Sequence, residues 1–71
     1  MDWLKKLRIE KKLTHDEVAV LAGMTRAYYS MIENGVRTPS PSYAIRLGEI
    51  LGFNWTRFYA DSETSEVIAK A

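Results

Sequence analysis

Apolar residues recur every three or four positions along most of this chain, a period that predicts amphipathic α-helices. The expected helices cover residues 2–12, 15–22, 26–34, 41–51 and 55–59. An all-α fold follows from this pattern. The side chains expected to face a common core are Leu4, Leu7, Val18, Ala19, Leu21, Tyr29, Ile32, Ala44, Leu47, Gly48, Leu51, Trp55 and Phe58.

The second and third expected helices each begin with a threonine. Thr14 with Glu17 three residues later is a capping-box pattern, and Thr25 is a second candidate cap. Asn34-Gly35 suits a left-handed helix stop. Eight residues, a tight glycine turn and nine more residues form the layout of a helix-turn-helix. Such a pair can place its second helix in the DNA major groove.

The remaining segments are punctuated by turn-forming residues. Residues 35–42 are rich in Pro, Ser and Gly and predict a surface loop. Ser40-Pro41 suits the start of the next helix, because proline has no amide hydrogen to lose there. We expect one domain over residues 1–59. The polar segment 60–71 is either a frayed end or a short helix, with a role in dimerisation as one option.

Composition excludes several function classes. A chain of 71 residues makes one small domain with little room for a catalytic cleft and its support. It has no cysteine, no apolar run near the roughly 20 residues that span a bilayer, and no signal peptide, so we expect a cytoplasmic protein. The single histidine, His15, has no carboxylate cluster around it. We therefore expect no enzyme, no catalytic residue, no metal and no cofactor.

Charge is unevenly distributed along the chain. The net charge is only +1, which argues weakly for nucleic acid. Residues 1–59 hold nine Lys/Arg against six Asp/Glu, whereas residues 60–71 hold one lysine against three acidic residues. The expected domain is thus mildly basic and its tail acidic, and phosphate contact needs positive charge only locally.

Several separated motifs together identify a family. They are LKKLRIEKKLT, DEVAVLAGMT, IENG and TPSPSYAIRLGEILGF followed by NW, in this order. In these motifs the chain resembles the Cro/C1-type (xenobiotic-response-element) helix-turn-helix regulators of phages and bacteria, from Leu4 to about Tyr59. The resemblance implies a compact, five-helix, lambda-repressor-like domain whose second and third helices form the helix-turn-helix.

The resemblance also implies which residues read DNA. The family's base-reading positions fall on Arg26, Ala27 and Met31, with Tyr28 and Ser30 near the groove wall. Arg26 would fork onto guanine O6 and N7, and Ala27 or Met31 would touch a thymine methyl group. Ala27 and Met31 depart from the family, whose members carry amides there. Tyr28 would donate its hydroxyl to a phosphate.

Further roles follow from the same resemblance. His15 would contact phosphate and brace Arg26, in which case mild acid should strengthen binding by charging the imidazole. Arg8 and Glu33 match an ion pair that fixes the recognition helix on the scaffold. The remaining expected DNA contacts are Thr25, Asn34, Arg37 and Thr38.

The favoured function is a sequence-specific regulator of transcription, a repressor that binds an inverted repeat in double-stranded DNA as a homodimer. Regulation by concentration or by a partner protein is expected rather than by a small-molecule effector or a membrane. The expected dimer surface comprises Trp55, Phe58, Tyr59, Val67 and Ile68.

The alternative function is a protein-interaction module, antitoxin-like or an adaptor, with the same fold. Tyr28 and Met31 would then form an apolar hot spot for another protein. Salt separates the two functions, because binding through phosphates weakens steeply with added salt whereas apolar association does not.

Overall fold

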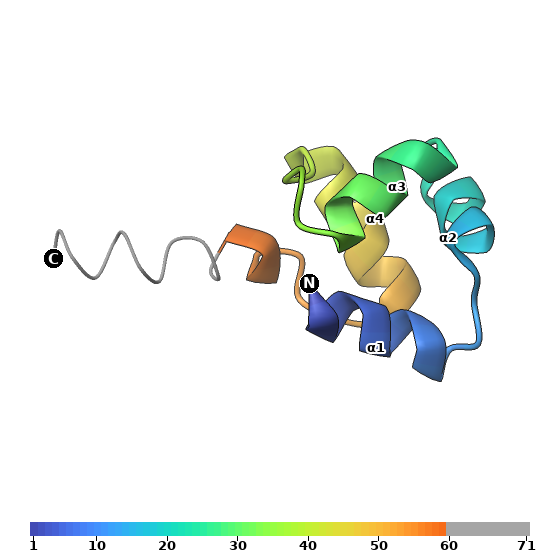
Figure 1. The fold of residues 1–71 in the computed structure, drawn as a ribbon. Helices are drawn as coiled ribbons and strands as arrows, with labels where there is room; N and C mark the ends of the chain where they lie inside the picture. Colours follow the sequence, from blue (N-terminus) through green and yellow to red (C-terminus); the bar gives the residue numbers. More distant parts are fainter. Residues whose placement is uncertain (60–71) are drawn as a thin grey trace, which may run out of the picture.

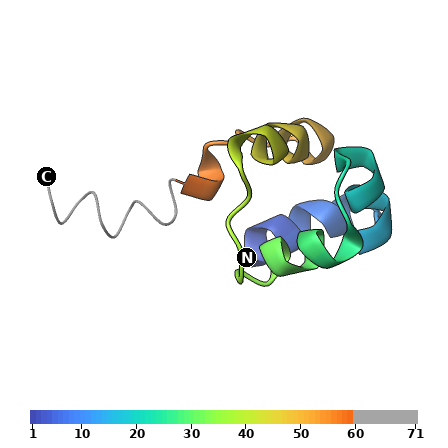
Figure 2. The ribbon, with the colours of Figure 1, turned by 90° about the horizontal axis from the view of Figure 1, so that it is seen from above.

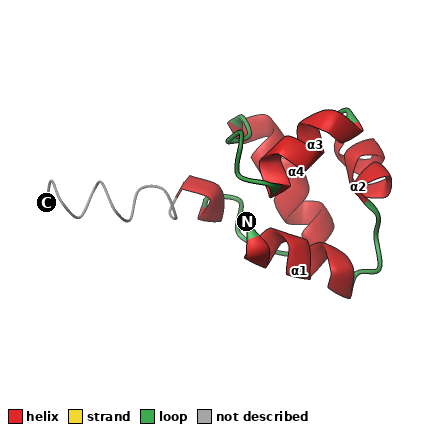
Figure 3. Ribbon diagram, in the orientation of Figure 1, coloured by secondary structure: helices red, strands yellow, loops and turns green. Residues whose placement is uncertain are grey.

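The computed structural model describes residues 1–59 and shows an all-helical architecture there, as the periodicity predicts. A helical turn at residues 57–59 ends the described part (Figures 1 and 3). Residues 60–71, including the Val67 and Ile68 of the expected dimer surface, lie outside the described residues. The four α-helices are α1 (Asp2–Glu10), α2 (His15–Ala22), α3 (Arg26–Glu33) and α4 (Pro41–Leu51).

The helices pack around α2 and α3. The helix α2 contacts both α3 and α4, and α1 lies against α3 (Figure 2). The helical turn at 57–59 returns to the start of α1, where the rings of Trp3 and Phe58 are 5.3 Å apart. Both ends of the described chain therefore close the same side of the bundle. The buried apolar residues are Leu4, Val18, Ala19, Ala22, Tyr29, Ile32, Ala44, Leu47, Leu51 and Phe58.

The starts of α2 and α3 are capped as the sequence predicts. Thr14 Oγ1 accepts from the Glu17 amide at 3.1 Å, and the Glu17 carboxylate accepts from the Thr14 amide at 2.8 Å. Thr25 Oγ1 accepts from the Tyr28 amide at 3.1 Å. Each bond satisfies an amide that the helix itself leaves without a partner. The boundaries of the helix-turn-helix are thus set locally.

Two glycines permit close approaches that fix the packing. Gly23 ends α2 with φ +73°, a left-handed conformation that side chains disfavour. Gly48 lies in α4, where an added Cβ would come within 2.7 Å of the Phe53 carbonyl oxygen. Any side chain at residue 48 would therefore push away the segment that leads to the helical turn at 57–59.

Two details of the sequence-based interpretation are wrong. The first helix ends at Glu10, not at residue 12, because Lys12 adopts φ +58° and turns the chain toward α2. Leu21 is 59% exposed instead of buried. The small Ala19 and Ala22 form the inner side of α2 in its place, which allows α3 and α4 to approach closely.

Within residues 1–59, no helix has the length and apolar character needed to cross a membrane.

Candidate nucleic-acid interface

One side of α3 is open to solvent and carries the residues expected to meet DNA. Arg26 and Ala27 are exposed, whereas Tyr28, Ser30 and Met31 are half-buried. We call the outer side formed by Arg26, Ala27, Ser30 and Met31 the recognition face. The Arg26 side chain makes no hydrogen bond or ion pair with any other residue of the described part. Its guanidinium donors therefore remain available to an external acceptor.

The opposite side of α3 is held inside the protein. Tyr29 and Ile32 are fully buried, and the charged Glu33 is only 5% exposed. A buried carboxylate is unfavourable unless donors surround it. Glu33 meets this condition, because within residues 1–59 no buried side-chain nitrogen or oxygen lacks a hydrogen-bond partner.

Three elements converge on the Glu33 carboxylate. Arg8 of α1 donates from Nε to Oε1 at 2.8 Å and from Nη2 to Oε2 at 3.3 Å. The Tyr29 hydroxyl, one turn earlier on α3, donates to Oε1 at 2.8 Å. His15 Nε2 at the start of α2 lies 2.9 Å from Oε2. We call Arg8, His15, Tyr29 and Glu33 the Glu33 cluster.

Electrostatics in this cluster favour the ionised carboxylate. Burial by itself raises the pKa of Glu33, but the hydrogen bonds from Arg8 and Tyr29 outweigh it and hold the pKa below its ordinary value. Burial and the neighbouring carboxylate raise the pKa of the Tyr29 hydroxyl, so it stays protonated and donates. Hydrogen bonding to Glu33 raises the pKa of Arg8. The cluster therefore joins α1, α2 and α3 around one ionised carboxylate.

The structure gives the His15 imidazole two partners that the sequence did not predict. Its Nε2 is engaged by Glu33, and its Nδ1 lies 2.8 Å from Ser30 Oγ. Both ring nitrogens are therefore engaged inside the protein, while His15 also shares a hollow with Arg26. Among the described residues no three His, Asp or Glu side chains are grouped so as to hold a metal ion.

An aromatic contact between α3 and α4, beside the recognition face, was not predicted from the sequence. The Tyr28 ring lies 5.3 Å from the Tyr43 ring of α4, and the Arg46 guanidinium is 6.0 Å from the Tyr43 ring centre. Together with Thr25, the two tyrosines line a shallow hollow. Nothing in the spacing of residues 28 and 43 indicates this contact, which depends on the packing of α4 beside α3.

The loop after α3 is open to solvent. Asn34, Arg37 and Thr38 are all exposed, so their side chains are available to a DNA backbone that follows α3. The amides of Val36 and Arg37 donate back to the Met31 carbonyl at 2.8 and 3.2 Å. These bonds fix the start of the loop against the end of α3.

The expected dimer surface is only partly on the outside. Phe58 is 1% exposed and packs inside its own protomer, so it is unavailable to a second chain. Trp55 and Tyr59 are half-buried, with their rings 5.9 Å apart. The Tyr59 hydroxyl also donates to the Pro39 carbonyl at 2.8 Å, which ties the helical turn to the loop before α4.

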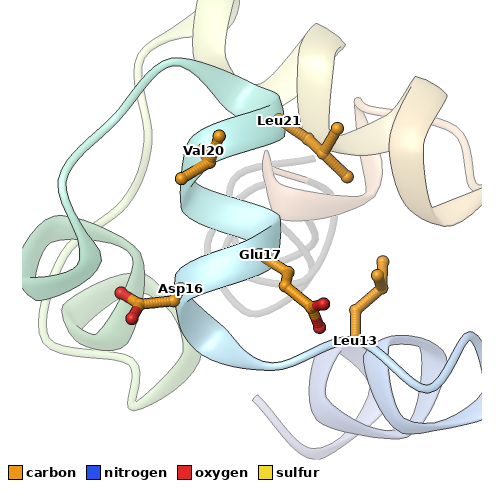
Figure 4. A pocket seen from close by; sticks show the side chains of 5 residues that line it. All are labelled: Leu13, Asp16, Glu17, Val20 and Leu21. Carbon is orange, nitrogen blue, oxygen red and sulfur yellow. The ribbon is translucent and has the colours of Figure 1, made fainter.

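A separate apolar surface lies on α2 and includes Leu21, which the sequence predicted to be core. Val20 is 76% exposed and Leu21 is 59% exposed. With Leu13, Asp16 and Glu17 they line an open hollow (Figure 4). In this view Leu13, Glu17 and Leu21 follow one another along one side of α2, and Asp16 lies on the other. This apolar surface is acidic at its edge, unlike the recognition face.

Comparison with known proteins agrees with this geometry. A family model described as "Helix-turn-helix" matches residues 4–58, which include α2, α3 and the turn between them. The chain belongs to the Cro/C1-type helix-turn-helix family. An uncharacterised HTH-type transcriptional regulator, YqaF of Bacillus subtilis (strain 168), is 56% identical over 59 residues, covering 83% of this chain and 78% of the relative. No solved structure gives a significant match. This family consists of DNA-binding transcriptional regulators that are not enzymes, in agreement with the sequence-based prediction.

Proposed function

We propose that this chain is a cytoplasmic transcriptional repressor that binds an inverted repeat as a homodimer, with α3 in the major groove. The observation that carries the proposal is the two-sided character of α3. Its inner side is held by Tyr29, Ile32 and Glu33, and its first turn presents Arg26 and Ala27 to solvent. A recognition helix needs this combination of a fixed position and unoccupied side chains.

The roles on the recognition face follow from side-chain chemistry. Arg26 forks onto guanine O6 and N7, and Ala27 and Met31 contact thymine methyl groups. Thr25 and Tyr28 lie at the groove wall, where backbone phosphates pass. Asn34, Arg37 and Thr38 contact the DNA backbone from the loop.

A homodimer gives this small domain sufficient specificity. One module buries limited surface on DNA, and two copies on half-sites about 34 Å apart read twice as many base pairs. Trp55 and Tyr59 are the described residues that we assign to the dimer surface, with residues 60–71 as its continuation. Repression is then controlled by protein concentration or by a partner protein.

Selection of bound duplexes from a random pool, at low and at moderate salt, tests the proposal. We expect a guanine-containing inverted repeat, two chains per duplex by native mass spectrometry, and affinity that falls steeply with salt. Binding without sequence preference would overturn the proposed sequence-specific function. A single chain bound to a site without a repeat would overturn the proposed homodimer.

The second candidate function, a protein-interaction module, is favoured by the apolar surface on α2. Val20 and Leu21 expose large apolar side chains that no described residue covers. A partner held there would bind independently of salt, and Val20→Asp would abolish its binding while leaving DNA affinity unchanged. If Val20→Asp instead loses DNA affinity at unchanged stability, this surface takes part in DNA binding and not in binding another protein.

A further inference from the structure

A row of hydrogen bonds leads from the buried carboxylate to the recognition face. Glu33 Oε2 meets His15 Nε2 at 2.9 Å, and His15 Nδ1 meets Ser30 Oγ at 2.8 Å. The imidazole ring is held in place by an edge contact with Tyr29, at 5.4 Å between ring centres. Ser30 is half-buried, so part of this residue remains open to solvent.

The chemistry of the carboxylate dictates where the protons lie. An ionised carboxylate only accepts hydrogen bonds, so the neutral imidazole must carry its proton on Nε2 and donate it to Glu33. Nδ1 is then a bare acceptor, and the Ser30 hydroxyl donates to it. A serine hydroxyl has one proton and two lone pairs, so Ser30 presents only lone pairs to the groove in this state.

We propose that the row Glu33–His15–Ser30 sets the hydrogen-bond polarity of Ser30 toward DNA and makes Ser30 a specificity-determining residue. This inference rests on the proposed function. With neutral His15, Ser30 accepts from the exocyclic amino group of adenine or cytosine in the major groove. The acceptors guanine N7 and O6 and thymine O4 are disfavoured opposite it.

Protonation of His15 reverses this polarity. One proton added at Nδ1 makes this nitrogen a donor to Ser30 Oγ, and the Ser30 proton turns outward. Ser30 then donates to guanine or thymine acceptors or to a phosphate oxygen, so the proton on Nδ1 changes which bases Ser30 prefers.

Other charges around the imidazole are compatible with both states. Glu33 accepts from Nε2 in either one, and Tyr29 of α3 presents a protonated hydroxyl to the same carboxylate. His15 also lines a hollow with three charged residues. Two are positive, Arg8 of α1 and Arg26 of α3, and one is negative, Asp16 of α2. The imidazole thus has two arginines and two carboxylates, Asp16 and Glu33, around it, whose formal charges cancel.

The proton arrangement is tested without DNA. His15 is the only histidine of the chain, so the imidazole nitrogens give unambiguous resonances in ¹⁵N NMR. Near pH 8 we expect a protonated Nε2 and an unprotonated Nδ1. The opposite tautomer, or an equal mixture of both, would overturn the inference.

The consequence for DNA is tested by duplex selection at about pH 8 and about pH 5.5, with wild type, Ser30→Ala and His15→Gln. In wild type we expect one position per half-site to change from adenine or cytosine toward guanine or thymine in acid. One neutral hydrogen bond is involved, so the preference at this position should be roughly fivefold. Ser30→Ala should lose the preference at both pH values, and His15→Gln should make it independent of pH.

The outcomes separate this inference from the proposed function. A selected inverted repeat without a pH-dependent position, or with equal pH dependence in His15→Gln, overturns the inference alone. An unchanged motif in Ser30→Ala does the same. The absence of any selected motif in wild type overturns the proposed function and this inference with it. Thermal unfolding at both pH values confirms that each variant is folded.

Discussion

The two ends of α3 differ in how their side chains are used. At its start Arg26 and Ala27 are exposed, and Arg26 has no partner within residues 1–59. At its end Glu33 is buried and receives donors from Arg8, Tyr29 and His15. One helix of eight residues therefore combines a reading end with an anchoring end.

The two ends of α3 therefore have different tasks: one places the helix, and the other is available for contacts with bases. The anchoring end joins α1, α2 and α3, so it decides where the recognition helix lies relative to the rest of the domain. In the proposed function, the reading end decides which bases are contacted once the helix is in the groove. Ser30 lies between the two ends in the sequence, and its hydroxyl is linked to the anchoring end through His15.

Removing the anchor should have the largest effect. Glu33→Ala leaves the Arg8 guanidinium, only 12% exposed, without its counter-charge. We expect a loss of about 3 kcal/mol in the free energy of unfolding, measured by urea denaturation. Glu49→Ala, on the exposed side of α4, is the matched control and should change stability by less than about 0.5 kcal/mol. Equal losses in the two variants would contradict the anchoring role, and Arg8→Met with Glu33→Met should recover part of the loss.

Removing the reader should weaken binding and leave the fold intact. Arg26→Ala should reduce affinity for the selected site by about 1–3 kcal/mol, with unchanged stability, because Arg26 touches no described partner. Arg26→Lys keeps the charge but loses the two-pronged geometry that guanine requires. Full affinity in Arg26→Lys, measured by fluorescence anisotropy, would show that Arg26 contacts phosphate instead of guanine.

Loss of the cap on α3 should have a smaller effect. Thr25→Ala removes the acceptor of the Tyr28 amide and should cost about 1 kcal/mol of stability. Thr38→Ala, in the exposed loop where no helix is capped, is the control for the loss of a threonine side chain. If thermal unfolding shifts equally in both, Thr25 has no capping contribution.

Acid should produce the smallest effect, because burial and hydrogen bonding oppose each other at Glu33. The fold lowers the pKa of Glu33, so on acidification the unfolded chain takes up this proton first. The contribution of the ionised Glu33 to the free energy of unfolding is therefore fully present above the pKa that Glu33 has in the unfolded chain. It is lost as the pH falls through the lower pKa that Glu33 has in the folded protein. Glu33→Gln should show a flatter dependence of the unfolding free energy on pH than wild type. An identical slope would contradict the lowered pKa.

Local chemistry allowed the helices and caps to be predicted from the sequence. Thr14, Glu17 and Thr25 act within three residues of their partners, and the Pro and Gly positions mark where α4 begins and ends. The family resemblance also placed Arg8 opposite Glu33, and the structure contains this ion pair at 2.8 Å.

The contacts that were missed depend on packing between elements. His15 meets Ser30 and Glu33, 15 and 18 residues away, and no sequence spacing indicates which neighbour an imidazole will find. Leu21 fits the apolar period, but α2 turns its small alanines inward to admit α3 and α4. The packing of the neighbouring helices therefore determines which side chains of α2 are buried.

The most direct test of the separation between anchor and reader compares wild type, Arg26→Ala and Glu33→Gln in one duplex selection, at a temperature where all three are folded. We predict that Arg26→Ala loses the guanine preference at one position per half-site and keeps the others. Glu33→Gln should bind all sequences more weakly and keep the guanine preference that Arg26 confers. Loss of the guanine preference in Glu33→Gln, together with uniform weakening in Arg26→Ala, would contradict the separation of anchor and reader.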